Sequence, residues 1–119
     1  MTLNGMPLML LTTIGAKSGA RRSVLINRFP DNDSATSWIV TATAGGSATH
    51  PAWFINLAKH PDQVWVEMDH REIHVRPEIL RGDERTVAYA RIAELAPNFA
   101  GYPSVTDREI PVVRLITTP

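Results

Sequence analysis

The sequence has no cysteine, and this absence excludes disulfides, thiolate metal sites and cysteine nucleophiles. Long apolar runs are missing too, since the longest one begins at Met6 and is interrupted by Pro7. Such a run is too short to span a bilayer. No basic residue precedes Lys17, so the first residues do not resemble a secretory signal. We therefore expect a cytoplasmic protein without a membrane anchor in this chain.

The chain also lacks an excess of charge of either sign, because 12 basic and 12 acidic residues give a formal net charge of zero. Proteins that bind nucleic acid need an excess of lysine and arginine to neutralise phosphates, so a nucleic-acid partner is not expected. With 44% hydrophobic and 20% charged residues, the 119 residues have the composition of one soluble globular domain, 1–119. The core of such a domain is modest, which favours a ligand site in a surface groove or between subunits.

Short segments rich in β-branched residues and bounded by turn residues predict strands. The predicted strands cover residues 8–13, 23–29, 37–44, 63–68, 72–77 and 110–117. They follow one another through hairpins and do not alternate strictly with helices. This pattern favours a mainly β (α+β) fold, a small antiparallel barrel of about six strands with helices packed outside.

Two segments predict helices. The first follows Pro51, which suits a first helical turn, and ends before Pro61, because the residue preceding a proline avoids the helical conformation. The second runs from Gly82 to about Ala96. Residues at helical spacing are expected to form its buried stripe: Ala88, Ile92 and Leu95.

Residues 15–22, with the sequence GAKSGARR, combine two glycines with three basic residues. Glycine lets backbone N–H groups approach a ligand closely, and successive N–H groups in such turns form an anion-binding hollow. Arginine adds bidentate hydrogen bonds to phosphate or carboxylate. The segment therefore predicts an anion site, with a solvated turn as the alternative interpretation. A nucleotide P-loop does not fit, because Ala16 stands where that motif needs a glycine before Lys17.

Other features carry weaker signals. Small residues at 41–46 (TATAGG) leave room for a flat ring at the end of a strand, although a plain strand-to-helix turn gives the same pattern.

Residues 70–74 (HREIH) lack the H-E-x-x-H order and lie on a predicted hairpin, so no metal site is expected. Ser18 has no evident histidine and aspartate partners, which makes a hydrolase triad a weak interpretation. Phe99 and Tyr102 lie in a loop with proline and glycine, where exposed aromatic residues more often serve binding.

Taken together, several segments resemble the deazaflavin-dependent nitroreductases, also called F-420-dependent quinone reductases. The segments follow the family's order over most of the chain, and their combination is specific where any single one is not. They are residues 10–19 (LLTTIGAKSG) with Arg22, 43–46 (TAGG), 50–57 (HPAWFINL), 60–61 (HP) and 106–113 (TDREIPVV).

The resemblance implies a split β-barrel of the FMN-binding type found in pyridoxamine-oxidase-like proteins, with two or three packed helices. It implies reduced coenzyme F-420 as hydride donor, a cofactor with a deazaflavin ring, a ribityl phosphate and an acidic lactyl-glutamyl tail. It implies that Lys17, Ser18 and Arg22 hold the phosphate, with Ala16 lining the same loop. The other implied cofactor contacts are Ser23, Val24, Leu25, Ile26, Asn27, Thr41, Ala42, Thr43, Ala44, Ala52, Trp53, Phe54, Ile55, Asn56 and, over the ring, Phe99.

The sequence also departs from the family pattern. Ala16 stands where many members have arginine and Ala44 where some have lysine, and both changes weaken the grip on the anionic tail. Arg21, at a position often occupied by proline, is expected to compensate in part. The family's tyrosine-rich substrate loop is represented here by Ala96, Phe99 and Tyr102, so nitroimidazole reduction is not implied.

The expected function is that of an oxidoreductase, which uses reduced F-420 to reduce a quinone, an enone or a nitro compound. The cofactor supplies the hydride, and the protein supplies position and charge complementarity. Tyr102, or water, is the candidate for protonating the product, and Thr43 is the candidate for orienting the substrate. The alternatives are an FMN-dependent oxidoreductase on the same fold, a non-enzymatic deazaflavin carrier, a barrel that binds single-stranded nucleic acid, and a plain interaction module. A homodimer is possible, but the sequence does not decide it, because no stripe of residues that would mark a dimer interface can be identified.

Overall fold

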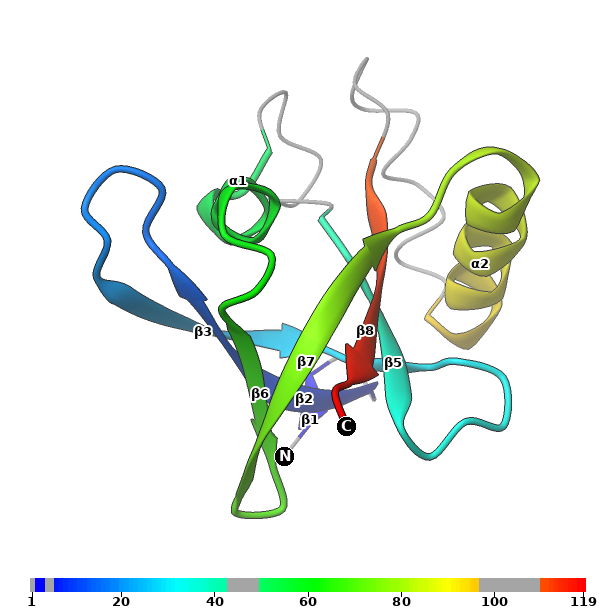
Figure 1. The fold of residues 1–119 in the computed structure, drawn as a ribbon. Coiled ribbons are helices and arrows are strands. Elements are labelled where there is room, and N and C mark those ends of the chain that lie inside the picture. Colours follow the sequence, from blue (N-terminus) through cyan, green and yellow to red (C-terminus); the bar gives the residue numbers. More distant parts are fainter. Residues whose placement is uncertain (1, 4–5, 43–49, 97–109) are drawn as a thin grey trace.

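The computed structural model describes residues 2–3, 6–42, 50–96 and 110–119. Antiparallel pairing joins eight strands into one curled sheet (Figure 1). They are β1 (Thr2–Leu3), β2 (Met6–Ile14), β3 (Arg21–Asn27), β4 (Phe29–Pro30), β5 (Ser37–Thr41), β6 (Val64–Met68), β7 (Arg71–Ile79) and β8 (Val112–Thr117). Within these residues the sheet carries two helices, α1 (Ala52–Lys59) and α2 (Gly82–Leu95). Neither described helix is long and apolar enough to cross a membrane.

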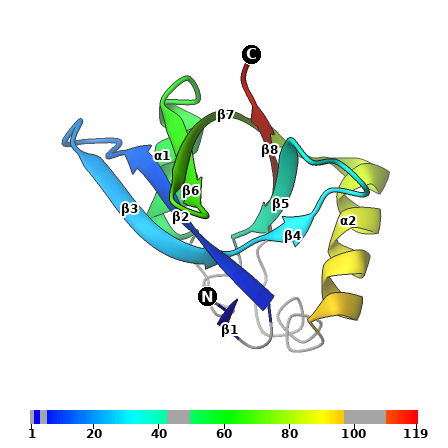
Figure 2. The ribbon, with the colours of Figure 1, turned by 90° about the horizontal axis from the view of Figure 1, so that it is seen from below.

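The segment from β3 to β4 closes the sheet into a barrel (Figure 2). β3 pairs with β2, in a register that runs from Leu8↔Asn27 to Ile14↔Arg21. After Arg28 the chain continues as β4, which pairs with β5 through Phe29↔Ile39. β3 itself has no second partner strand among the described residues, so the barrel is split beside it.

The mainly β, split-barrel prediction is therefore confirmed, but the strand count differs from the expected six. The predicted strand 23–29 divides at Arg28, because its two halves pair with different neighbours. β1 adds a two-residue strand that the sequence pattern did not indicate. The predicted strand 37–44 ends at Thr41, and its last two positions lie outside the described residues.

Both predicted helices are present, and one detail of α2 is wrong. Leu95, expected in the buried stripe, is 49% exposed, whereas Tyr89 is 8% exposed. The stripe that faces the sheet runs through Tyr89, Ile92 and Ala96. From Ile92 the stripe continues four residues on to Ala96, and Leu95, three residues after Ile92, lies at the edge of the stripe and stays exposed.

The core has two parts because β5 and β8 are buried on both faces. Val40 and Val113 belong to the cluster inside the barrel, which also holds Leu57 of α1. Their neighbours Ile39 and Val112 belong to a second cluster, formed with α2. Successive side chains of a strand point to opposite faces, so one pair of strands supports both helices.

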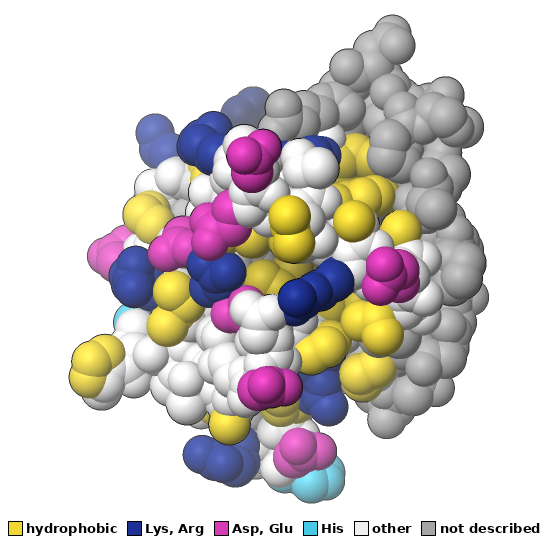
Figure 3. Space-filling model, turned by 90° about the vertical axis from the view of Figure 1, so that its right-hand side faces the viewer, with side chains coloured by type: hydrophobic (Ala, Val, Ile, Leu, Met, Phe, Trp, Pro, Cys, Tyr) yellow, Lys and Arg dark blue, Asp and Glu magenta, His cyan; other side chains and the backbone are white. Residues whose placement is uncertain are grey.

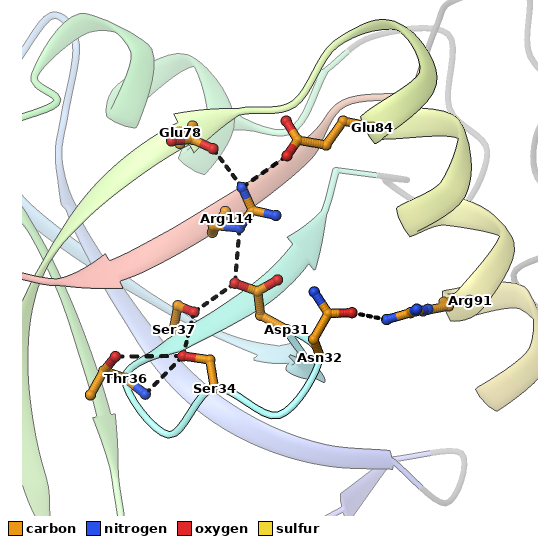
Figure 4. A network of polar contacts seen from close by, with 9 residues as sticks. All are labelled: Asp31, Asn32, Ser34, Thr36, Ser37, Glu78, Glu84, Arg91 and Arg114. Atoms are coloured by element: carbon orange, nitrogen blue, oxygen red, sulfur yellow. Dashed lines mark hydrogen bonds and ion pairs between the residues drawn. The ribbon is translucent and has the colours of Figure 1, made fainter.

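Arg114 of β8 joins three parts of the chain on the α2 side of the sheet (Figure 4). Its guanidinium donates to Asp31 at 2.8 Å, to Glu78 of β7 at 2.6 Å and to Glu84 of α2 at 3.3 Å. The buried carboxylate of Asp31 also accepts a 2.6 Å hydrogen bond from Ser37. Burial alone would lower the pKa of Arg114, but the hydrogen bonds to Asp31 and Glu78 raise it above its ordinary value.

Polar contacts also fasten α2 elsewhere. Arg85 donates two hydrogen bonds to the carbonyl of Ile110, at 2.9 and 2.6 Å, and Arg91 donates to Asn32. The outward side of α2 leaves Val87 57% exposed. Figure 3, which looks onto the side of the molecule that carries α2, shows hydrophobic side chains there interspersed with charged ones. The helix is therefore held by arginine contacts together with a narrow buried stripe.

The β6–β7 turn generates a testable prediction. Asp69 and His70 have φ angles of 53° and 62°, the left-handed values of a two-residue turn that strongly prefers Asn-Gly. Replacing both residues (Asp69→Asn with His70→Gly) is expected to raise the free energy of unfolding by about 1 kcal/mol, because a Cβ is disfavoured at positive φ. Urea denaturation measures the gain. His70→Ala keeps the Cβ and serves as the control, so an equal gain there would contradict this explanation.

Candidate functional site

A groove of about 670 Å³ opens beside the split in the barrel. Its walls come from the loop after β2, the first half of β3 and the start of α1. The lining residues are Thr13, Gly15, Ala16, Lys17, Ser18, Arg22, Ser23, Val24, Pro51, Ala52, Trp53, Ile55 and Asn56. We refer to this hollow as the groove, and to residues 15–20 as the anion loop.

The anion loop is a tight turn held by its own backbone. The N–H of Gly15 donates to the carbonyl of Ala20 at 2.8 Å, and the N–H of Gly19 donates to the carbonyl of Gly15 at 2.9 Å. Gly19 has a φ of 72°, and a Cβ on Gly15 would lie 2.5 Å from Ser18 Oγ. Gly19 therefore meets a backbone requirement of the turn, whereas a side chain at Gly15 would only displace the Ser18 hydroxyl.

The side chains of the two adjacent arginines that follow the loop lie on opposite sides of the sheet. Arg22 lines the groove together with Lys17. Arg21 instead lies 4.6 Å from the centre of the Trp65 ring and forms a 3.2 Å ion pair with Glu72. Because neighbouring residues of a strand face opposite sides, the expected compensation by Arg21 is wrong: its charge is directed away from the groove and is already paired.

Asn56 connects the two walls of the groove. Its Oδ1 accepts a 3.0 Å hydrogen bond from the N–H of Ala16, and its Nδ2 donates a 3.3 Å hydrogen bond to Thr13 Oγ1. The Asn56 and Thr13 side chains are both buried, at 7% and 1% exposure. The sequence contained one signal for this link, an asparagine on the buried face of a short apolar helix. It did not indicate the partner, because Ala16 lies 40 residues away and a local pattern does not record such a contact.

The groove also has an apolar surface. Trp53 and Ala52 belong to α1, and Ile55, on the same helix, is 49% exposed. Val24 of β3 is 38% exposed. The groove therefore combines two cationic side chains with an accessible hydrophobic surface, an arrangement that suits a molecule with an anionic part and a flat apolar part.

The structure brings 10 of the implied cofactor contacts together in the groove. These are Ala16, Lys17, Ser18, Arg22, Ser23, Val24, Ala52, Trp53, Ile55 and Asn56. Three lining residues were not among those candidates: Thr13, Gly15 and Pro51. The sequence marked Gly15 and Pro51 only as turn and helix-start residues, and it gave no signal for Thr13.

Six other candidates do not line the groove. Ile26 and Phe54 pack against the barrel core, and Leu25 lines a separate hollow with Leu10. Thr41 and Ala42 both donate hydrogen bonds to the carbonyl of Pro111, each at 3.0 Å. The sixth is Asn27, at the end of β3. The four remaining candidates lie outside the described residues: Thr43, Ala44, Phe99 and Tyr102.

Comparison with protein families gives a match over nearly the whole chain. The family described as F420H(2)-dependent quinone reductase matches residues 1–117. An F420H(2)-dependent quinone reductase of Mycobacterium tuberculosis is 31% identical, over 92% of this chain and 72% of that protein.

Solved structures agree with the family match. An F420-H2 dependent reductase is 34% identical with a TM-score of 0.77, over 92% of this chain and 93% of that one. A domain-swapped dimer is also 34% identical, with a TM-score of 0.78, over 92% of this chain and 79% of that one.

The link made by Asn56 generates the second prediction. Replacing it (Asn56→Ala) leaves the Ala16 N–H and the Thr13 hydroxyl without this partner, and the free energy of unfolding is expected to fall by about 1–3 kcal/mol. Faster hydrogen exchange of the Ala16 amide, followed by NMR, reports the loosened loop directly. Lys59→Ala, on the exposed side of the same helix, is the matched control. Unchanged exchange at Ala16 in the Asn56 variant would show that the loop does not depend on α1.

Proposed function

This chain belongs to the F420H(2)-dependent quinone reductase family, and from that premise we propose that it reduces a quinone with reduced coenzyme F-420 held in the groove. The chain is an oxidoreductase, and coenzyme F-420 is its cofactor. The residues that hold the cofactor, and the choice of a quinone as acceptor, are the proposal. The observation that carries it is the pairing of free cationic side chains with an apolar wall in one groove.

The groove matches the chemistry of the cofactor in its charges. Lys17 and Arg22 form no ion pair with any described residue, and no carboxylate is among the residues that line the groove. Both cations are therefore available for the phosphate and the acidic tail. Ser18 adds a hydroxyl beside them. The half-buried ring of Trp53, with Ala52 and Val24, offers the apolar surface that a flat ring system needs.

The choice of a quinone as the acceptor rests on the lack of a proton-donating acid among the described residues that line the groove. Reduced F-420, when bound, supplies a hydride. The groove contains no aspartate, glutamate, histidine or tyrosine among the residues that line it. A quinone needs only protonation at oxygen, which water performs, whereas an enone must be protonated at carbon and a nitro group must lose water. Side chains that bind and orient, without a positioned acid, therefore suit the quinone best.

Two further roles belong to the proposal. Thr43 and Tyr102 orient the acceptor, and water supplies the proton. Both residues lie outside the described part of the chain. Their support is the family resemblance of the segments in which they occur.

A homodimer is also part of the proposal. One of the 34% identical structures is a domain-swapped dimer. In addition, β3 has no second partner strand among the described residues, and such an edge exposes backbone groups that can pair with another chain.

The anion loop and Arg22, which follows it, generate the third prediction. Lys17→Ala and Arg22→Ala are each expected to weaken the binding of reduced F-420 by about 1–3 kcal/mol, the range of charge-assisted hydrogen bonds. Calorimetric titration of the purified protein measures this loss. Arg21→Ala is the matched control, because this neighbour faces the other side of the sheet and is expected to leave the affinity unchanged. Equal affinity in all three variants would remove the loop from the site, and a purified protein that binds FMN but not F-420 would overturn the cofactor assignment.

The acceptor generates the fourth prediction. With reduced F-420 as donor, kcat/KM for menadione is expected to exceed that for 2-cyclohexenone and nitrobenzene by about 100-fold or more, the usual contribution of a positioned general acid. Anaerobic oxidation of the cofactor, followed by absorbance, gives the three values. Comparable reduction of the enone would contradict the choice of a quinone, and its loss in Tyr102→Phe would identify the acid. Tight binding of F-420 without turnover of any acceptor would favour a carrier.

A further inference from the structure

A second hollow, of about 510 Å³, lies among the strands at another part of the barrel. Its residues come from the segment before β5, the β6–β7 hairpin, the end of β8 and the β3–β4 break. We call it the hairpin hollow; its relevant side chains are Arg28, Trp38, Met68, Asp69, Arg71 and Ile73. No residue lines both this hollow and the groove. Its volume lies within the roughly 300–1,000 Å³ of small-molecule pockets.

The two arginines of the hairpin hollow are unneutralised. Neither Arg28 nor Arg71 has a side-chain hydrogen bond or ion pair with any described residue. The remaining charged residue in the lining, Asp69, forms no ion pair with either of them. This contrasts with Arg21 and Arg114, which both pair with carboxylates. Two arginines and one aspartate leave one positive charge at the hollow, which favours a ligand with a single negative charge.

The backbone holds both arginines in fixed places. The N–H of Arg28 donates to the carbonyl of Pro7 at 3.0 Å, which fixes the point where β3 ends and β4 begins. Arg71 is the first residue of β7 and pairs with Met68 across the two-residue turn. A binding group on a paired strand loses little backbone freedom when a ligand arrives.

The rest of the hollow is apolar and partly accessible. Trp38, Met68 and Ile73 are half-buried and pack against the barrel core. An indole ring gives a flat surface on which an aromatic ring stacks, and a guanidinium matches a carboxylate in plane. We propose that the hairpin hollow is a second ligand site, which binds a planar aromatic monocarboxylate with its ring on Trp38 and its carboxylate on Arg28 and Arg71.

This site is independent of the groove. The two hollows are lined by different residues and share none. A ligand in the hairpin hollow therefore does not displace the cofactor. Binding of both ligands to one molecule is the expected result, and it does not depend on the function proposed above.

The test uses 2-naphthoate as the probe, with the whole chain and no cofactor. Saturable binding is expected by calorimetry, with a shift of the Trp38 indole N–H resonance, which Trp38→Phe identifies. Arg28→Gln and Arg71→Gln are each expected to weaken binding about tenfold or more, since charge-assisted hydrogen bonds contribute about 1.5–3 kcal/mol. Arg76→Gln is the matched control, because Arg76 is an exposed arginine of the same strand β7 that does not line the hollow. Thermal denaturation checks that each variant is folded.

Any of the following outcomes would overturn the proposal. Absence of saturable binding at millimolar concentration excludes the site. Equal affinity for neutral 2-naphthamide, or wild-type affinity in both arginine variants, shows that the charge is not used. Loss of binding in Lys17→Ala places the probe in the groove. Loss in Arg28→Gln alone places it in the neighbouring hollow lined by Leu10 and Leu25, which contains Arg28 but not Arg71.

Discussion

The pairing of one continuous segment with two different strands determines the shape of this protein. Residues of β3 pair with β2, and after Arg28 the chain pairs with β5 as β4. A strand cannot follow both neighbours where they diverge, so the barrel is closed at β4 and split beside β3. The split is where the start of α1 and the anion loop approach each other, and it makes the groove. The break itself places Arg28 at the hairpin hollow.

Strand alternation then distributes the charges. Arg21 and Arg22 are adjacent in the sequence, yet one lies over Trp65 with Glu72 and the other lines the groove. An ion pair between exposed side chains contributes little to stability, so the importance of the Arg21–Glu72 pair lies in removing one cation from the anion site. The cationic character of the groove therefore depends on Lys17 and Arg22. In an electrically neutral chain, this local separation of charge is what allows an anionic cofactor to be held.

The two helices are attached by different means. Leu57 inserts α1 into the barrel cluster, and Asn56 ties the same helix to the anion loop. α2 packs on the outside, where Arg114 gathers carboxylates from three parts of the chain. Charges removed from water are costly unless they are paired, so this network fixes the position of α2 more than it adds stability.

The sequence by itself determined most of the strands, the two helices, the glycine-rich loop and the family, because each is recorded in local spacing or in a motif. It also identified Lys17, Ser18, Arg22 and Trp53, which belong to such motifs and line the groove. It did not indicate β1 or the break at Arg28, because both depend on which strands pair. Only the tertiary structure decided that Arg21 faces away, that Asn56 reaches Ala16, and that Leu95 lies outside the buried stripe. These facts depend on register and packing between segments far apart in the chain, such as residues 21 and 72 or 16 and 56. A local pattern records which faces of an element are polar, but it does not record which distant element will cover them.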